Sequence, residues 1–268
     1  MATSEHSSIP TTRGGITVHT WPNPAATWIA ILVHGYGEHL GRYDHVADRL
    51  ARDGAVVLGP DHQGHGRSDG EPVSIDDFET LVDDLHLVVD GARRAYAGLP
   101  LVMIGHSMGG MIGTRYAQRF GDDLAALVLS GPVLGSWVAT DSASQLGVIP
   151  DDPLDVSTLS RDPAVGEAYA ADPLVWHGPF KRETLLALRA ALETINVGGD
   201  LGSLPTLWVH GEADALVPID ATREGIARIK GSDLTEVIYP DARHEVFNET
   251  NREDVLAAVA SFALTHVG

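Results

Sequence analysis

The chain of 268 residues contains no cysteine and only two lysines, Lys181 and Lys230. Without cysteine it can form no disulfide, no thiolate zinc site and no cysteine nucleophile, so its chemistry must rest on other side chains. Basic residues are few, 18 against 37 acidic ones, which gives a formal net charge of −19. A field of that sign repels the phosphates of nucleic acids. We therefore expect no nucleic-acid partner.

Long apolar runs are also missing. No stretch approaches the roughly 18 residues that a membrane-spanning helix needs, and residues 1–15 are polar, without the hydrophobic segment of a signal peptide. The sequence predicts a cytoplasmic protein with no transmembrane segment and leaves peripheral contact with membranes open. Even so, 44% of the residues are hydrophobic, and a chain of this length can bury about three-quarters of its unfolded surface.

Short apolar runs alternate with helix-like segments along much of the chain. The predicted strands are residues 16–19, 28–33, 55–58, 101–104, 126–129, 207–209 and 236–239. Helical patterns cover residues 43–50, 76–96 and 108–120, the second with Ser74 and Asp77 as a candidate capping pair. Strands that alternate with helices predict an α/β fold, with a mostly parallel sheet covered by helices on both faces.

The alternation stops between Gly131 and Leu204. Six prolines interrupt this stretch, and the predicted helices there are limited to residues 136–146 and 181–197. The stretch is too long and too apolar for a disordered linker. We therefore predict a core made of residues 1–131 and 203–268, and an inserted cap, residues 132–202, that folds over the strand ends.

The pentapeptide Gly105-His106-Ser107-Met108-Gly109 lies between a predicted strand and a predicted helix. A serine on a sharp strand-to-helix turn projects its hydroxyl above the sheet, and the tight turn favours glycine on either side. Taken alone, the pattern G-x-S-x-G is weak, because glycine and serine also populate ordinary turns. Its position between strand and helix makes Ser107 the candidate nucleophile.

A serine nucleophile needs a histidine base and a carboxylate that orients the base. Asp214 and His244 each follow a predicted strand, and reactive groups gather beyond the carboxyl ends of strands in such sheets. The chain order serine, aspartate, histidine is that of the α/β-hydrolases. Glu212 and Asp241 remain alternative acids at this point.

The oxyanion formed by serine attack needs preorganised N–H donors. We expect one from Met108, directly after the nucleophile, and one from Tyr36, in the glycine-rich loop after the strand at residues 28–33. The glycine spacing in that loop does not match the dinucleotide-binding pattern G-x-G-x-x-G. His62 and His65 resemble a metal cluster in composition only, since a metal site would also need a third ligand at a suitable spacing and a supporting carboxylate, and we expect no metal.

Several segments carry a resemblance to a known family. They are residues 34–39 (HGYGEH), 41–43 (GRY), 61–68 (DHQGHGRS), 105–110 (GHSMGG), 172–175 (DPLV), 177–178 (HG) and 244–245 (HE). Together they closely resemble monoacylglycerol lipases, which are α/β-hydrolases. The resemblance implies the fold and a cofactor-free hydrolysis of monoacylglycerols to fatty acid and glycerol. It also implies a small lipid ester as substrate and a cap that touches lipid.

Carried over position by position, the resemblance implies that Ser107, Asp214 and His244 form the catalytic triad. It also implies that Tyr36 and Met108 supply the oxyanion hole, and it places two further residues near the glycerol end of the substrate. These are Glu38 and Arg42. A broad-specificity carboxylesterase or lysophospholipase is the alternative within the same chemistry. A cofactor-free haloperoxidase or a hydrolase-like receptor would use the fold differently.

Overall fold

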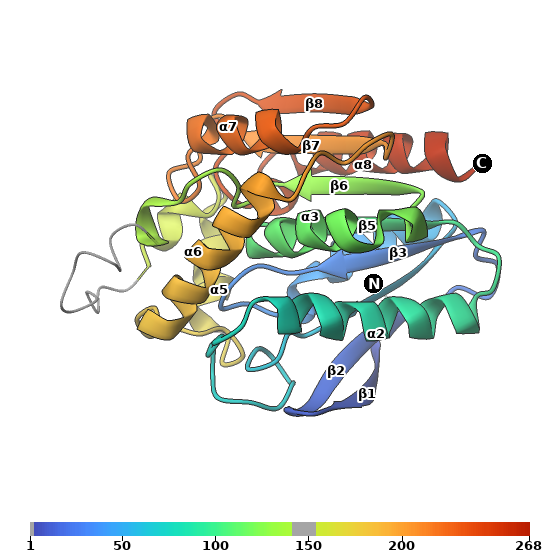
Figure 1. Ribbon diagram of the computed structural model, residues 1–268, viewed down its shortest axis with the longest axis horizontal. Coiled ribbons are helices and arrows are strands. Elements are labelled where there is room, and N and C mark those ends of the chain that lie inside the picture. Colours follow the sequence, from blue (N-terminus) through green and yellow to red (C-terminus); the bar gives the residue numbers. More distant parts are fainter. Residues whose placement is uncertain (1–2, 141–153) are drawn as a thin grey trace.

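The computed structural model describes residues 3–140 and 154–268, which contain an eight-stranded sheet with the order β1-β2-β4-β3-β5-β6-β7-β8 (Figure 1). The strands are β1 (Glu5–Thr11), β2 (Gly14–Trp21), β3 (Trp28–Val33), β4 (Ala55–Pro60), β5 (Leu101–His106), β6 (Ala126–Ser130), β7 (Thr206–Gly211) and β8 (Leu234–Tyr239). β1, β2 and β4 pair antiparallel, and every pairing from β4 through β3 to β8 is parallel. The predicted α/β-hydrolase fold is confirmed.

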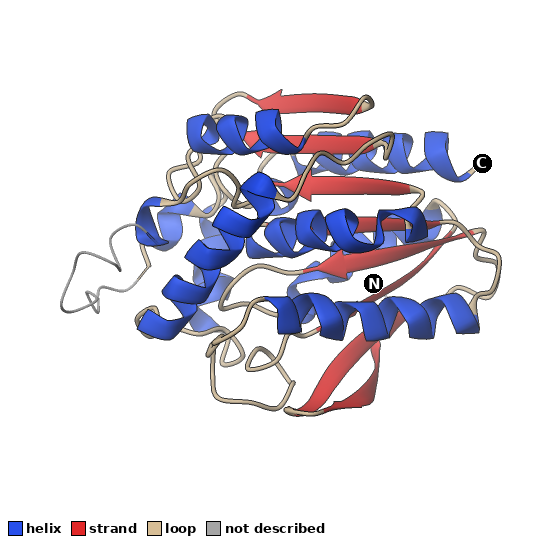
Figure 2. Ribbon diagram, viewed as in Figure 1, coloured by secondary structure: helices blue, strands red, loops and turns tan. Residues whose placement is uncertain are grey.

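Helices cover both faces of this sheet (Figure 2). They are α1 (Asp44–Arg52), α2 (Glu79–Ala95), α3 (Met108–Phe120), α5 (Pro163–Ala171), α6 (Arg182–Val197), α7 (Ile219–Ile229) and α8 (Arg252–Val267), with short 3₁₀ turns η1 (Leu40–Tyr43), η2 (Gly121–Asp123), η3 (Val156–Thr158) and η4 (Val246–Asn248). Alternate residues of β3 face opposite layers: Ile29 and Ile31 belong to the core cluster that includes residues of α2, α3, α6 and α7, whereas Ala30 and Leu32 belong to the cluster that includes residues of α1 and α8. Because both faces are buried, the central strands are apolar throughout.

Two local expectations differ from the structure. The pair Ser74 and Asp77 does not cap α2, because the helix begins at Glu79, and Phe78 at its N-cap makes no side-chain hydrogen bond. Instead Oδ1 of Asp77 accepts the N–H of Glu79 at 3.0 Å in a local turn. The edge strand β1 was not predicted, because its residues are polar and mostly exposed and it is held by pairing with β2.

The described part of residues 132–202 holds η3, α5 and α6 and contributes no strand. α6 packs into the same core as α3 through Leu188 and Ile195, so this segment is anchored on the sheet domain. The helix predicted at 136–146 extends beyond the described residues. The division into core and cap therefore stays a prediction. Within residues 3–140 and 154–268, no helix combines the length and the apolar character that crossing a membrane requires.

Candidate active site

Ser107 occupies a strained turn between β5 and α3. Its backbone has φ 56° and ψ −120°, in a region that non-glycine residues rarely adopt. The glycines on either side are required by close packing. A Cβ at Gly105 would lie 2.3 Å from the carbonyl oxygen of Gly109, and one at Gly109 would lie 2.0 Å from that of Val33. The local sequence therefore dictates the turn that presents the hydroxyl.

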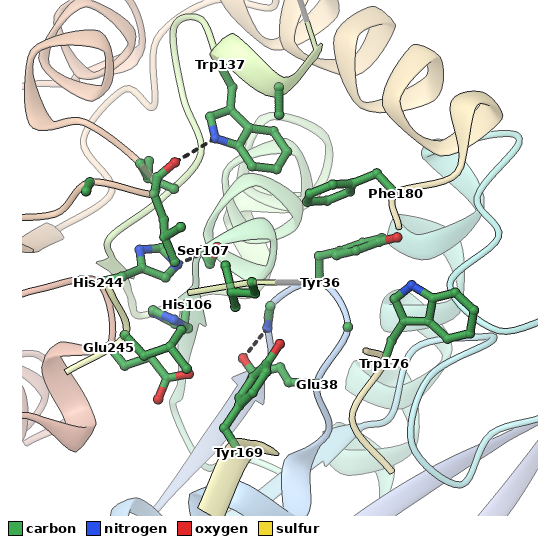
Figure 3. A pocket seen from close by; sticks show the side chains of 18 of the residues that line it. Tyr36, Glu38, His106, Ser107, Trp137, Tyr169, Trp176, Phe180, His244 and Glu245 are labelled. Carbon is green, nitrogen blue, oxygen red and sulfur yellow. Dashed lines mark hydrogen bonds between the residues drawn. The ribbon is translucent and has the colours of Figure 1, made fainter. Parts of the chain in front are cut away.

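The structure brings Ser107, His244 and Asp214 together at the carboxyl ends of the strands. Nε2 of His244 lies 3.0 Å from Oγ of Ser107 (Figure 3). Nδ1 of the same ring lies 2.7 Å from Oδ2 of Asp214. His244 follows β8, and Asp214 lies in the loop between β7 and α7. This is the geometry in which a carboxylate orients an imidazole that can take the serine proton.

The carboxylate of Asp214 is oriented by its own loop. Oδ1 accepts the backbone N–H groups of Leu216 at 2.9 Å and Val217 at 2.8 Å. This leaves Oδ2 facing His244. The two alternative acids, Glu212 and Asp241, are exposed.

Electrostatics prepare the pair for proton transfer. Burial alone would raise the pKa of Asp214, but the charge of His244 and hydrogen bonds from His210 and His244 hold it well below its usual value. Burial would lower the pKa of His244, yet the neighbouring charge of Asp214 outweighs burial and raises it above 6.5. Asp214 therefore stays ionised while His244 becomes the neutral base as the pH rises.

The glycine-rich loop between β3 and η1 lies directly against Ser107. A Cβ on Gly35 would be 3.2 Å from Cβ of Ser107. Tyr36 follows in this loop and lines the cavity above the serine. As the first residue of α3, Met108 has a backbone N–H without an intrahelical acceptor. The positions of Tyr36 and Met108 beside Ser107 suit the predicted oxyanion donors, and their role stays a prediction.

Glu38 and Arg42 line the same cavity but bind other protein groups. Oε1 of Glu38 accepts the N–H of Gly35 and the hydroxyl of Tyr43, both at 2.7 Å, and Oε2 lies 2.5 Å from Nη1 of Arg42. Arg42 also makes a bidentate pair with Glu245, with both distances 2.8 Å. Their predicted contact with glycerol stays a prediction, whereas their bracing of the loop is visible here.

Glu245 is a site residue that sequence reasoning missed. It is 4% exposed, lines the cavity and directly follows the candidate base His244. Opposite charges outweigh burial, so Arg42 holds the pKa of Glu245 low, at about 2. Its place next to the candidate base in the sequence was the available signal.

A cavity of about 350 Å³ opens above Ser107 and is lined mostly by apolar side chains. Aromatic rings dominate its walls: Tyr36, Trp137, Tyr169, Trp176 and Phe180. The rings of Tyr36 and Phe180 stack with centroids 4.6 Å apart (Figure 3). Such a lining suits an acyl chain or another apolar group.

The histidines near this loop are occupied by the protein itself. The backbone N–H of His62 donates to Nε2 of His34 at 3.0 Å, and Nε2 of His62 lies 3.1 Å from the carbonyl oxygen of His34. Burial lowers the pKa of His62 to about 3, which keeps it neutral. In the part of the chain that the structure describes, no group of three or more histidine, aspartate or glutamate side chains could hold a metal ion.

Comparisons with known proteins agree with the fold. The family model described as serine aminopeptidase, S33 matches residues 24–251. The chain is 37% identical to a monoacylglycerol lipase of Mycolicibacterium smegmatis, with 98% of both chains covered. It is 32% identical to the human monoglyceride lipase over 81% of this chain and 75% of that protein.

Solved structures show the same relationship. The crystal structure of the Paleococcus ferrophilus monoacylglycerol lipase superposes with a TM-score of 0.82 at 26% identity, covering 94% of this chain and 99% of that one. A soluble variant of the Saccharomyces cerevisiae monoglyceride lipase has a TM-score of 0.85 at 22% identity, with 100% and 97% covered, which supports the fold. The chain therefore belongs to the serine aminopeptidase S33 family of α/β-hydrolase enzymes, in the branch that contains the monoacylglycerol lipases.

Proposed function

We propose that the chain is a serine hydrolase that cleaves monoacylglycerols into fatty acid and glycerol. The observation that carries this proposal is the hydrogen-bonded series from Ser107 through His244 to Asp214 at the floor of an apolar cavity. The relative named monoacylglycerol lipase, which is matched over 98% of both chains, supports the choice of ester.

In the proposed reaction, Nε2 of His244 takes the proton of Ser107 as Oγ attacks the ester carbonyl carbon. The ionised Asp214 stabilises the imidazolium, and the N–H groups of Tyr36 and Met108 stabilise the oxyanion. The tetrahedral intermediate collapses, and glycerol leaves with the proton from His244. A water molecule, deprotonated by His244, then attacks the acyl-enzyme; the bond from the acyl carbon to Oγ breaks, His244 returns the proton to Oγ of Ser107, and the fatty acid is released.

The charges around the cavity favour a neutral head group. Glu38 and Glu245 outnumber the single guanidinium of Arg42 on this wall, and Asp214 adds a further negative charge nearby. A phosphate group would be repelled there, whereas the hydroxyls of glycerol can hydrogen-bond to charged and polar groups alike. This favours monoacylglycerol over the lysophospholipid alternative, although Phospholipase YtpA of Bacillus subtilis is a relative at 26% identity over 91% of this chain.

The proposal includes contact between the cap and lipid surfaces. Val138 and Leu154 line the cavity and are also exposed, to 67% and 40% of their surfaces. Apolar side chains that are exposed beside a cavity can enter the surface of a lipid aggregate and guide a substrate inward. The small lipid ester would then pass directly from the aggregate to Ser107.

The test is the turnover of a medium-chain monoacylglycerol by Ser107→Ala and by the parent. We expect kcat to fall by about 10³-fold or more and labelling by a fluorophosphonate to disappear. Ser261→Ala, an exposed serine on α8, is the matched control and keeps both. Activity of Ser107→Ala within tenfold of the parent would reject the assignment. The same assay with a lysophospholipid and a simple ester separates the substrate alternatives.

A further inference from the structure

A second imidazole lies behind the carboxylate of Asp214 and has no part in the mechanism above. His210, near the end of β7, is fully buried. Its Nε2 is 2.9 Å from the carbonyl oxygen of Val217 and 3.3 Å from Oδ2 of Asp214. The catalytic carboxylate is therefore flanked by two histidines, His244 and His210.

The tautomer of His210 is set by its neighbour on the same strand. Nε1–H of Trp208, two residues earlier, donates to Nδ1 of His210 at 3.1 Å. An indole N–H can only donate, so Nδ1 must carry a lone pair and the ring proton must be on Nε2. That proton points at the carbonyl oxygen of Val217, and Oδ2 of Asp214 lies 3.3 Å from the same nitrogen.

Val217 links this contact to the orientation of the carboxylate. Its carbonyl oxygen accepts from His210, while its own N–H donates to Oδ1 of Asp214 at 2.8 Å. The imidazole of His210 thus fixes the carbonyl oxygen of Val217, and the N–H of Val217 in turn fixes the carboxylate of Asp214. A group that orients a catalytic side chain in this way supports the geometry of the site, although it does not touch the reacting atoms.

We propose that His210 is a positioning residue that fixes Asp214, both by holding the segment from Asp214 to Val217 and by sharing its Nε2 proton with Oδ2. The proposal rests on the proposed serine-hydrolase function, in which Asp214 orients His244. Sharing Oδ2 between two donors also moderates the negative charge that Asp214 presents to His244. Losing His210 should therefore misorient Asp214 and strengthen its effect on the charge of His244.

This effect can be read from the titration of His244. The charged and titratable groups that face this ring are Asp214 after β7, His106 at the end of β5, Glu38 after β3 and its neighbour Glu245. A substitution at position 210 replaces none of these groups. A shift in the acid limb of the kcat/KM profile then reports the change at Asp214.

The experiment compares His210→Leu with His210→Gln, assayed on p-nitrophenyl butyrate from pH 5 to 9. Leucine removes the donor, and we expect kcat to fall about tenfold or more with little change in KM. The rise of kcat/KM with pH should also move to higher pH. Glutamine places an amide N–H₂ near the position of Nε2, and we expect it to restore most of kcat and the parental rise of kcat/KM with pH.

The matched control is His19→Leu. His19 is also buried and its Nε2 faces a buried carboxylate, with 3.1 Å to Oδ2 of Asp61, but this pair does not line the cavity. We expect this control to lose stability and to keep its kcat and its pH profile. An unchanged kcat and limb in His210→Leu, or a His210→Gln enzyme as impaired as His210→Leu, would overturn the proposal.

Trp208→Phe tests the same contact if His210→Leu does not fold. It removes the N–H that sets the tautomer of His210, and we expect a smaller fall in kcat than in His210→Leu. A folded Trp208→Phe enzyme with parental kcat would overturn the proposal. A simple ester is used because its turnover does not depend on the glycerol head group. If the parent cleaves this ester but no monoacylglycerol, the proposed substrate fails while the role of His210 is still measured.

Discussion

Arg42 and Glu245 lie face to face, with two nitrogen–oxygen distances of 2.8 Å, although they are 203 positions apart in the chain. Arg42 also binds Glu38, which accepts the N–H of Gly35 in the loop beside Ser107. One guanidinium therefore joins the loop proposed to hold the oxyanion to the segment that carries His244. The two halves of the site should respond together when this connection is weakened.

Replacing Glu245 by glutamine tests this connection. We expect kcat to fall about tenfold with KM little changed, because transition-state contacts depend on the geometry of both loops. The free energy of unfolding should fall by about 1–3 kcal/mol, since a buried charged hydrogen bond is lost. Steady-state kinetics and urea unfolding measure the two effects.

Glu79→Gln is the control for the loss of an arginine–carboxylate pair. Glu79 on α2 binds Arg115 and Arg119 of α3 at 2.6 and 2.7 Å, and it does not line the cavity. Because this pair is partly exposed, its removal should cost at most about 1 kcal/mol and leave kcat at the parental value. A Glu245→Gln enzyme with parental kcat would show that the two loops are positioned independently.

The pH profile should reflect the charge of His244. Its pKa is raised from 6.5 chiefly by Asp214, with smaller contributions from Glu245 and Glu38, against the opposing effect of burial. The base must be neutral to act, so kcat/KM should rise with pH through a midpoint above 6.5. Glu245→Gln removes a negative charge and should move this midpoint to lower pH.

His106 should not contribute to that midpoint. It lies beside His244, but burial and the neighbouring ring lower its pKa to about 4, so it stays neutral across the working range. A kcat/KM profile measured on p-nitrophenyl butyrate resolves the limb. A midpoint at or below 6.5 would contradict the electrostatic account of His244.

Replacing two helix glycines by alanine should have opposite effects on stability. A Cβ at Gly109 in α3 would lie 2.0 Å from the carbonyl oxygen of Val33, whereas one at Gly91 in α2 would meet nothing within 4 Å. We expect Gly109→Ala to shift the elbow, lose most activity and lower the melting temperature. Gly91→Ala should stabilise the protein by about 0.5–1 kcal/mol and keep its activity. Thermal unfolding of both variants checks the pair, and a tolerated Gly109→Ala would contradict the packing argument.

The proposed lipid contact can be tested at the cavity rim. Val138→Ser should reduce binding to phosphatidylcholine vesicles that contain monoacylglycerol, and turnover of that substrate in vesicles, by about tenfold, which corresponds to the roughly 1.5 kcal/mol gained by burying a valine side chain. Turnover of the water-soluble p-nitrophenyl butyrate should not change. Val197→Ser is the control, since Val197 is 84% exposed at the end of α6 and does not line the cavity. Equal vesicle binding by both variants would place the contact elsewhere.

The central strands could be predicted because parallel strands buried on both faces are apolar along their whole length, as in residues 28–33. Helix α5 was not predicted, although the signal was present. Asp162 caps it by accepting the N–H of Ala164, and Pro163 stands at its first turn. Strand β1 carried no such signal, because five of its seven residues are exposed and the hydrogen bonds to β2 hold it in place.

The sequence by itself determined the turn at Ser107 and the strand ends that carry Asp214 and His244, because glycine requirements, strand patterns and turn chemistry are local properties. Only the tertiary structure decided that Arg42 meets Glu245. That contact depends on the order in which β3 and β8 join the sheet and on the angles at which their loops leave it. Spacing along a chain does not contain that information, since residues 203 positions apart can be neighbours only once the sheet has formed.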